Sequence, residues 1–479
     1  MPLFTRADLL AANQCARRAW LQQHPPAEAP ERLRLPRSDD RDAVRDAMRR
    51  RYPGGITIPV EAPLETRLAA TAAAIADTAI PAIFDATFAF DQIVVRAAVL
   101  ERRPGGFVVS EAKAANSVGE AHELDVAVVG WVAAQTGTPI AGLSLAHFDP
   151  DYVRRETLDD QALFVVVPVL PREFATAHAR LRASAARADE PPAKVGHHCQ
   201  HPRECPFRTH CAPSTGEFSV QRLPRAGKVQ QELAELGVTD VRQIPTHVRM
   251  NPTQQHAVWS LVNHAEYIGG GLLPSLRNVR WPLRFLDFEA CQPAVPRWPG
   301  TSPFQQLPTQ WSMHVQYEDG RVEHSAFLHT EDSDPREAFV RSLVTAVGTE
   351  GSILVYSGYE ATTLRGLRDR MPEAWSEFEG IVNRIMDMLP VIRDHYYHPD
   401  LEGSFSIKAV LPAVCPDVGY DDLEVQDGAT AARLWLRMIS SGTPDDERAH
   451  IRASLLAYCE RDTLALLCVR EALVARAGG

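Results

Sequence analysis

Two residue pairs in the C-terminal half have the types and spacing of a metal-binding site. Asp287 and Glu289 lie in the apolar stretch Arg-Phe-Leu-Asp-Phe-Glu-Ala, and residues i and i+2 of a strand project from the same face. Tyr458 and Asp462 are four residues apart, a spacing that puts both side chains on one face of a helix. Converging carboxylates bind Mg²⁺ or Mn²⁺. The two pairs therefore predict metal-dependent phosphodiester chemistry.

The order of several motifs in residues 281–479 resembles that of the DEDD exonucleases, the DnaQ-like group of the RNase H-like superfamily. More closely, it resembles an uncharacterised bacterial domain found behind RecB-type modules. The resemblance implies a mixed-sheet RNase H-like domain in which Asp287, Glu289 and Asp462 hold two divalent ions and Tyr458 orients the attacking water. The motifs are Leu286-Asp-Phe-Glu-Ala290, Pro308-Thr-Gln-Trp-Ser-Met-His-Val315, Val355-Tyr-Ser-Gly-Tyr-Glu360, Asp387-Met-Leu-Pro390, Gly403-Ser-Phe-Ser-Ile-Lys-Ala-Val410 and Tyr458-Cys-Glu-Arg-Asp-Thr463.

The resemblance also implies a fourth acid at the head of a helix. Glu360 fits this slot best because it follows the apolar run 352–356 and precedes a helical stretch, although the family usually carries Asp there. Asp387 is the competing candidate, in a context that is usually structural. Lys408 begins another helical stretch and is either a phosphate contact or a solvated lysine. His314 is interpreted as a sheet histidine rather than a catalyst.

Four of the eight cysteines have the spacing of metal ligands. Cys199, Cys205 and Cys211 form a Cys-x5-Cys-x5-Cys series, and Cys15 lies far upstream. One early and three late cysteines resemble the iron-sulfur RecB-type nucleases, including CRISPR-associated and AddB-like proteins, which implies a [4Fe-4S] cluster. Zinc is an alternative because histidines interleave with the cysteines, and unligated thiols are another. The remaining cysteines are predicted to be core residues: Cys291, Cys415, Cys459 and Cys468.

Between these cysteines, Glu111 and Lys113 follow a predicted hairpin whose turn is Pro104-Gly105-Gly106. This segment resembles the PD-(D/E)XK nuclease core, in which the Glu and an acid on the preceding strand bind Mg²⁺. Ala98 stands where that acid is expected, either through natural loss or through an engineered change, so this site is expected to be weak or inactive. Asp85 and Asp125 are auxiliary carboxylates. Asp125 is expected to begin the next helix, where its charge would favour the helix N-terminus.

Length and composition set the wider frame. A chain of 479 residues exceeds one ordinary core, and we expect an α/β protein with a RecB-like domain at 1–215, a helical connector at 216–280 and the exonuclease domain at 281–479. The connector resembles a helix-hairpin-helix or is simply two short helices. The sequence lacks an apolar run of membrane-span length and a signal-peptide pattern, so a cytoplasmic location is expected.

Three functional hypotheses follow from these patterns. The leading one is a 3′–5′ exonuclease acting on single-stranded DNA or RNA ends, with an impaired first site. The second keeps both nuclease sites active in the natural protein. The third is a nucleic-acid-binding scaffold with two inactive nuclease folds. The net charge of −11 disfavours phosphate binding, but an acidic domain can bind nucleic acid through metal ions. The expected partner is therefore nucleic acid, with DNA favoured, and not a membrane.

Overall fold

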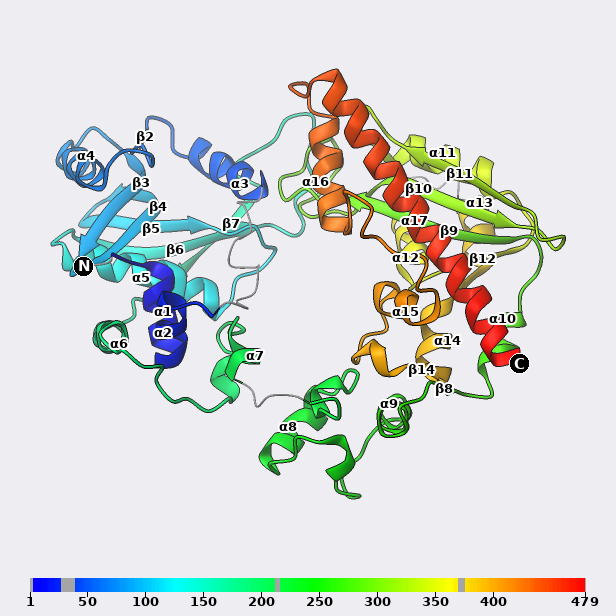
Figure 1. Ribbon diagram of the computed structural model, residues 1–479. Coiled ribbons are helices and arrows are strands. Elements are labelled where there is room, and N and C mark those ends of the chain that lie inside the picture. The colour runs from blue at the N-terminus through cyan, green and yellow to red at the C-terminus, as the bar shows by residue number, and fades with distance from the viewer. Residues whose placement is uncertain (1–2, 27–38, 212–215, 369–374, 479) are drawn as a thin grey trace. The chain divides into compact units, whose positions relative to one another are not determined.

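The computed structural model describes residues 3–26, 39–211, 216–368 and 375–478 (Figure 1). It is a mixed α/β protein with two large mixed sheets. The chain divides into two compact units, residues 1–213 with 293–305, and residues 214–292 with 306–479. The segment expected as a connector thus lies within the second unit. Within the described residues, none of the helices has the length and apolarity needed to cross a membrane.

The sheet of the first unit has the order β2-β3-β4-β5-β6-β7, and β1 pairs with β4. Strands β3, β4 and β5 run antiparallel, and β5 is parallel to β6. The helices and strands of this unit are β1 (Phe4–Thr5), α1 (Arg6–Gln14), α2 (Ala16–Gln23), α3 (Asp39–Arg50), β2 (Ile56–Thr57), α4 (Leu64–Ala76), β3 (Ala82–Phe90), β4 (Ile93–Arg103), β5 (Gly106–Ala112), α5 (Glu120–Gln135), β6 (Ile140–Phe148), β7 (Phe164–Val169), α6 (Ala175–Ala185) and α7 (Arg208–Cys211).

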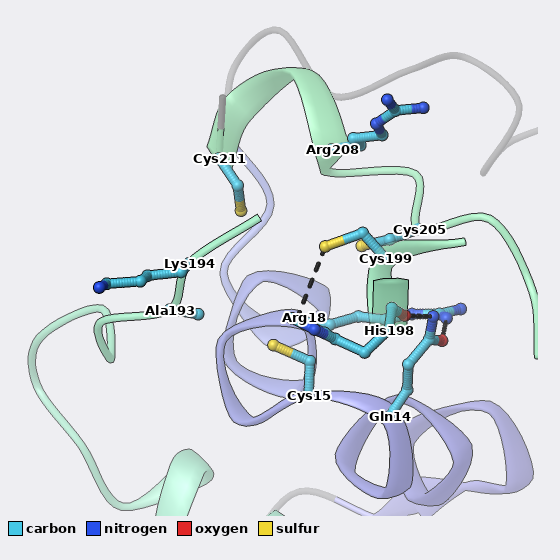
Figure 2. Close-up of a pocket in the computed structure, with 10 residues that line it drawn as sticks. All are labelled: Gln14, Cys15, Arg18, Ala193, Lys194, His198, Cys199, Cys205, Arg208 and Cys211. Atoms are coloured by element: carbon cyan, nitrogen blue, oxygen red, sulfur yellow. Dashed lines mark hydrogen bonds between the residues drawn. The ribbon is translucent and has the colours of Figure 1, made fainter. Parts of the chain in front are cut away.

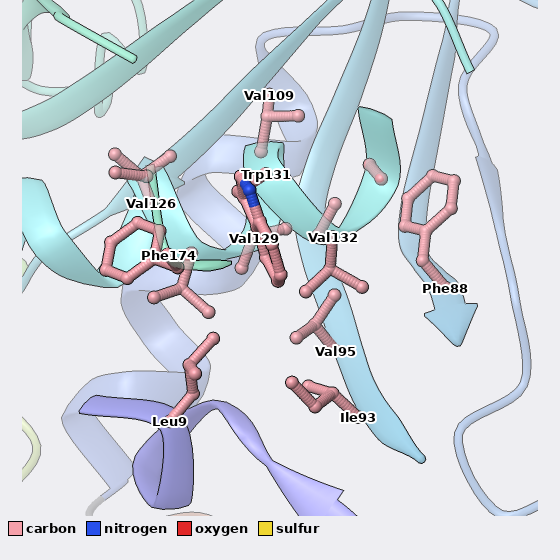
Figure 3. Packing of buried hydrophobic residues seen from close by; sticks show 14 of the residues in the cluster. Leu9, Phe88, Ile93, Val95, Val109, Val126, Val129, Trp131, Val132 and Phe174 are labelled. Atoms are coloured by element: carbon pink, nitrogen blue, oxygen red, sulfur yellow. The ribbon is translucent and has the colours of Figure 1, made fainter. Parts of the chain in front are cut away.

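The predicted hairpin is present in this sheet, and its turn explains why. Gly105 and Gly106 have φ angles of +86° and +144°, a region that favours glycine. A Cβ on Gly106 would lie 2.2 Å from the carbonyl oxygen of Pro139. The next helix, α5, is apolar from Val126 to Ala134 and packs into the core with β3, β4 and α1 (Figure 3). It begins at Glu120, so the expectation that Asp125 starts the helix was wrong.

The second unit is built on a five-stranded sheet of order β11-β10-β9-β12-β13. Strands β9, β10 and β11 are antiparallel, whereas β12 and β13 run parallel to β9. Its elements are α8 (Gly227–Glu235), α9 (Pro252–Asn263), β8 (Tyr267–Ile268), α10 (Leu272–Arg277), β9 (Leu283–Cys291), β10 (Leu307–Gln316), β11 (Val322–Leu328), α11 (Arg336–Val347), β12 (Ser352–Val355), α12 (Tyr359–Leu367), α13 (Trp375–Val382), β13 (Ile385–Asp387), α14 (Met388–His395), β14 (Tyr396–Tyr397), α15 (Ile407–Val414), α16 (Gly428–Met438) and α17 (Asp445–Gly478).

Alternation along β9 gives the two faces of this sheet different roles. Leu286 and Phe288 point into a core shared with α11, α12 and α13. The opposite face carries Phe285, which packs in a second core with α17, and it also carries Asp287 and Glu289. Helix α17 contacts both β9 and β10. The long C-terminal helix therefore covers the sheet face on which both predicted carboxylates lie.

Candidate metal-binding sites

Asp287, Glu289 and Asp462 converge although 175 residues separate the first from the last. One carboxylate oxygen from each lies within 4.8 Å of the others. Strand β9 supplies the first two, and α17 supplies Asp462. The side-chain amide of Gln310, opposite Glu289 on β10, donates to the carbonyl of Leu455 at 2.9 Å and fastens α17 to the sheet. The structure thus brings the predicted carboxylates together in one cluster.

The carboxylates of this cluster are poorly compensated by positive charge. Burial, followed by the nearby charge of Asp462, raises the pKa of Asp287 well above its usual value. The same two causes raise the pKa of Glu289 to about 8. Burial also raises the pKa of Asp462 to about 6. Carboxyl groups crowded in this way hold protons unless a cation replaces them, so the donor set fits hard divalent ions.

Glu360 is the fourth carboxylate of this region. It lies in the first turn of α12, its residue is 2% exposed, and its Oε2 has no hydrogen-bond partner among the described residues. Burial raises its pKa to about 8, and the charges of Asp387 and Glu289 act in the same direction. A buried carboxylate oxygen without a partner is costly. Glu360 is therefore well placed to serve a bound cation directly or through water.

Asp387 has a different environment from Glu360. Its Oδ1 accepts backbone N–H groups from Leu389 at 2.9 Å, which caps α14, and from Ser357 at 2.8 Å. Ser357 has a φ of +109°, a conformation that non-glycine residues rarely adopt. Asp387 therefore holds the turn between β12 and α12 that presents Glu360.

Tyr458, Lys408 and Tyr420 lie together beside Asp462. The Lys408 ammonium donates to the Tyr458 hydroxyl at 3.3 Å and also to the carbonyl of Gln426. Tyr420 donates its hydroxyl to Asp462 Oδ1 at 2.6 Å. Lys408 lies 5.1 Å and 5.2 Å from the ring centroids of Tyr420 and Tyr458. Lys408 therefore contacts the cluster while its residue remains solvent-exposed.

Two contacts of this cluster were missed in the sequence. Tyr420 lies in the irregular segment between α15 and α16, where no periodicity marks it. Cys459 was expected to be a core residue, and it is fully buried, but its Sγ also lies 3.6 Å from Asp287 Oδ2. The position of Cys459 next to Tyr458 on the helix was the available signal.

In the first unit, Glu111, Lys113 and Asp125 form an ion-pair network. Lys113 lies 2.7 Å from a carboxylate oxygen of both acids. Arg6 pairs with Glu111, and Arg203 lies 2.6 Å from Asp125. Burial alone would raise the pKa of Asp125, but Lys113, Arg6 and Arg203 together lower it. Asp125 is therefore an ion-pair partner within α5 rather than a helix-terminal charge.

Ala98 and Asp85 complete this first site. Val99 on β4 is paired with Ser110 on β5, so one step further along the antiparallel register Ala98 stands opposite Glu111. Asp85 interrupts the pairing of β3 with β4, has a φ of +57° and is 2% exposed. Arg49 contacts its carboxylate, and Arg96 lies 3.2 Å from it. Cations thus match each acid that remains in this site.

Cys15, Cys199, Cys205 and Cys211 line one pocket, although 196 residues separate the first from the last (Figure 2). All four are free thiols, and burial raises the pKa values of Cys205 and Cys211. The Cys205 backbone N–H donates to the carbonyl of Cys199 at 2.7 Å. Soft sulfur donors in one pocket fit an iron-sulfur cluster or zinc.

The interleaved histidines are mostly engaged elsewhere. His210 lies 3.1 Å from Glu190, and the rings of His197 and His201 stack at 4.0 Å. His198 also lines the pocket, with its Nε2 3.6 Å from the sulfur of Cys199. Among the described residues, the groups of three ligand atoms that lie within 4.8 Å of one another include none of these cysteines. Four sulfurs bound to one zinc ion would lie about 3.8 Å apart, which is closer than any three of these cysteine sulfurs lie to one another.

Comparison with known proteins gives a partial match. The profile of a domain of unknown function, DUF2779, matches residues 284–406. This match includes Asp287, Glu289 and Glu360 and ends before Lys408 and α17. The chain is also 24% identical over 205 residues to the uncharacterized protein MG366 homolog of Mycoplasma pneumoniae, a stretch that covers 39% of this chain and 31% of that protein. The chain thus spans less than a third of that relative. No solved structure matches.

Proposed function

We propose that the second unit is a metal-dependent 3′–5′ exonuclease that removes nucleotides from single-stranded DNA ends. The observation that carries this proposal is the convergence of Asp287, Glu289 and Asp462 within 4.8 Å, with their pKa values raised. A largely buried group of acids whose charge Lys408 offsets only in part suits divalent metal ions. The nearby unpartnered oxygen of Glu360 supports a second ion.

The sheet supports the RNase H-like part of this proposal. An antiparallel β9-β10-β11 unit continues into β12 and β13, which run parallel to β9. In open α/β sheets, sites form where side chains leave the ends of central strands. Asp287 and Glu289 lie in β9 just beyond Phe285, where the pairing of β9 with β12 ends, and Glu360 follows β12. This arrangement supports the assignment of the motifs to a DEDD-type exonuclease.

The chain's own residues define the chemistry of this site. Bound Mg²⁺ or Mn²⁺ would stabilise charge on the phosphate and on the leaving 3′ oxygen, and Asp287, Glu289 and Asp462 would hold these ions. Burial and the neighbouring carboxylates raise the pKa of Tyr458, so its hydroxyl stays protonated and orients a water. Tyr420 fixes the Asp462 carboxylate, and Lys408 supplies positive charge for the substrate phosphate.

For the first unit, we propose a RecB-like PD-(D/E)XK module that binds DNA and has lost most of its cleavage activity. Support comes from the strand order, from Glu111 and Lys113 at the end of β5, and from Ala98 opposite Glu111. The cysteine pocket supports a [4Fe-4S] cluster over a single zinc ion, because a cluster spreads its thiolate ligands over several metal atoms. Such a cluster would tie the two ends of the module together.

An end-labelled substrate panel tests the main proposal. Single-stranded DNA and RNA, labelled at either end, are incubated with the full chain in Mg²⁺, Mn²⁺ or EDTA. We expect metal-dependent release of nucleotides from the 3′ end of DNA. This release should fall at least about 100-fold in Asp287→Ala, because residues that act as a unit fail together, and persist in Glu318→Gln, which alters an exposed carboxylate.

A nucleic-acid-binding scaffold is the second candidate function, and the missing acid at Ala98 favours it. In that case the chain binds DNA, but neither metal supports turnover. The exonuclease proposal would be refuted by this absence of turnover, and equally by nucleotide release that Asp287→Ala leaves unchanged.

A further inference from the structure

Three side chains outside the carboxylate cluster are grouped as metal ligands. His314 lies on β10, His324 stands directly opposite it on β11, and Glu460 lies on α17. One ring nitrogen from each histidine and one oxygen of Glu460 lie within 4.8 Å of one another. The two imidazole centroids are 4.6 Å apart, and His324 Nδ1 is 3.7 Å from Glu460 Oε1.

The hydrogen bonds around the histidines determine which nitrogen of each ring is available. His314 Nδ1 lies 2.8 Å from the Thr463 hydroxyl, and His324 Nε2 lies 2.9 Å from the Ser312 hydroxyl. The two hydroxyls are 3.0 Å apart, and Thr463 donates to the carbonyl of Glu460 at 3.0 Å. A consistent assignment has Ser312 donating to Thr463, so each hydroxyl accepts an imidazole N–H.

This assignment leaves His314 Nε2 and His324 Nδ1 as lone-pair donors. Metal-bound histidines commonly donate their other ring N–H to a fixed acceptor, which sets the tautomer and the ring orientation. Ser312 and Thr463 provide this arrangement for both rings. Two neutral imidazoles and a carboxylate are also the donor types that zinc accepts.

We propose that His314, His324 and Glu460 bind one Zn²⁺ or a similar borderline divalent cation, separate from the ions of the carboxylate cluster. Zinc ligands about 2.0–2.1 Å from the metal lie about 3.3 Å from one another. The 3.7 Å spacing of His324 and Glu460 therefore needs only a small contraction. Because the Glu460 side chain is 50% exposed, it can make this movement, and water can complete the shell.

The consequence of such a site is a link between the β10–β11 hairpin and α17. Glu460 and Thr463 belong to the same helical turn as Asp462, and Ser312 is paired with Asp287 on β9. A cation held by the three ligands would therefore fix the turn that carries Asp462. This inference does not depend on the proposed exonuclease activity, because metal content and stability report on it directly.

Two substitutions remove one ligand atom while keeping the hydrogen bond of the other nitrogen. His324→Gln places an amide N–H where Nε2 bonds to Ser312, and His314→Asn places one where Nδ1 bonds to Thr463. The matched control is His450→Gln, because His450 is also on α17 and lies 2.8 Å from Glu424, and among the described residues it belongs to no group of three ligands.

The test measures zinc per chain by plasma mass spectrometry after zinc loading and desalting, and the melting temperature with and without zinc. We expect wild type and His450→Gln to hold one more zinc ion per chain than His324→Gln or His314→Asn. Zinc should also raise the melting temperature of wild type and His450→Gln more than that of His324→Gln or His314→Asn. The cysteine and carboxylate sites are the same in all four proteins, so they cancel in this difference. Equal zinc content in wild type and both ligand variants would overturn the proposal.

Discussion

The uncompensated charge of the carboxylate cluster predicts that removing one acid stabilises the metal-free protein. Glu289→Gln keeps the shape of the side chain but cannot ionise. In wild type, the pKa of Glu289 is raised to about 8 by burial and by Asp462. Folding at neutral pH therefore forces this group to take up a proton that the unfolded chain does not hold. The variant avoids this cost and should be more stable in EDTA.

The size and sign of the effect follow from the two pKa values. Because the pKa of Glu289 is higher in the folded protein than in the unfolded chain, its contribution to the stability of wild type is fully present below pH 4.5. This contribution is lost as the pH rises from 4.5 through about 8. Between pH 4.5 and 7 this loss amounts to about 3 kcal/mol, at about 1.4 kcal/mol per pH unit. Glu289 keeps part of its surface exposed, and solvent screening reduces the expected gain to about 1–3 kcal/mol at pH 7.

Calorimetry in EDTA at pH 5, 7 and 8.5 measures this effect, because it resolves separate transitions in a chain of two units. One wild-type transition should lose stability as pH rises, and Glu289→Gln should flatten that dependence. Saturating Mg²⁺ should reverse the order, since wild type gains binding free energy that the variant lacks. Glu318→Gln, in an exposed turn, is the control. Equal pH dependence of wild type and Glu289→Gln in EDTA would refute the reasoning.

Three further predictions concern the other features. Ala98→Asp places a carboxylate opposite Glu111 and should create metal-dependent DNA cleavage that survives Asp287→Ala; a revertant that cuts no better than the parent contradicts this. Cys15→Ser should remove the broad visible absorption of an iron-sulfur cluster and lower the melting temperature of the first unit by at least about 5 °C, whereas the control Cys468→Ser should change neither. A colourless, zinc-containing wild type would count against the cluster. Asp387→Asn removes the charge that accepts the Ser357 and Leu389 N–H groups and should cost about 1 kcal/mol in urea unfolding, an effect that an unchanged midpoint would exclude.

Local patterns predicted the parts of the molecule that depend on short-range order. The i, i+2 spacing of Asp287 and Glu289 and the i, i+4 spacing of Tyr458 and Asp462 fix which residues share a face, and both elements formed as expected. The hairpin turn at Gly105 and Gly106 was equally clear, because few other residues accept that backbone. Helix α4 and strand β7 went unassigned, since alanine-rich or short apolar runs suit several conformations.

Long-range partners could not be predicted in the same way. Tyr420 reaches Asp462 from an irregular segment, and Arg6 reaches Glu111 across 105 residues. Nothing in the local sequence specifies either contact, because each depends on how distant elements pack. The same holds for His324 and Glu460, which meet only when β11 and α17 lie against the same strand. Asp125 was misplaced at a helix start because the helix boundary itself was uncertain.

The two acidic sites differ in how their charge is balanced, and this difference explains why one suits metal ions better. In the first unit, Lys113 and Arg203 contact Asp125, and Arg6 contacts Glu111. These side chains neutralise both carboxylates without a metal ion. In the second unit, burial and then the neighbouring acids raise the pKa values of Asp287 and Glu289. A metal ion entering the first site must displace existing ion pairs, whereas one entering the second displaces only protons. The alanine at position 98 and these ion pairs therefore both disfavour metal binding at the first site.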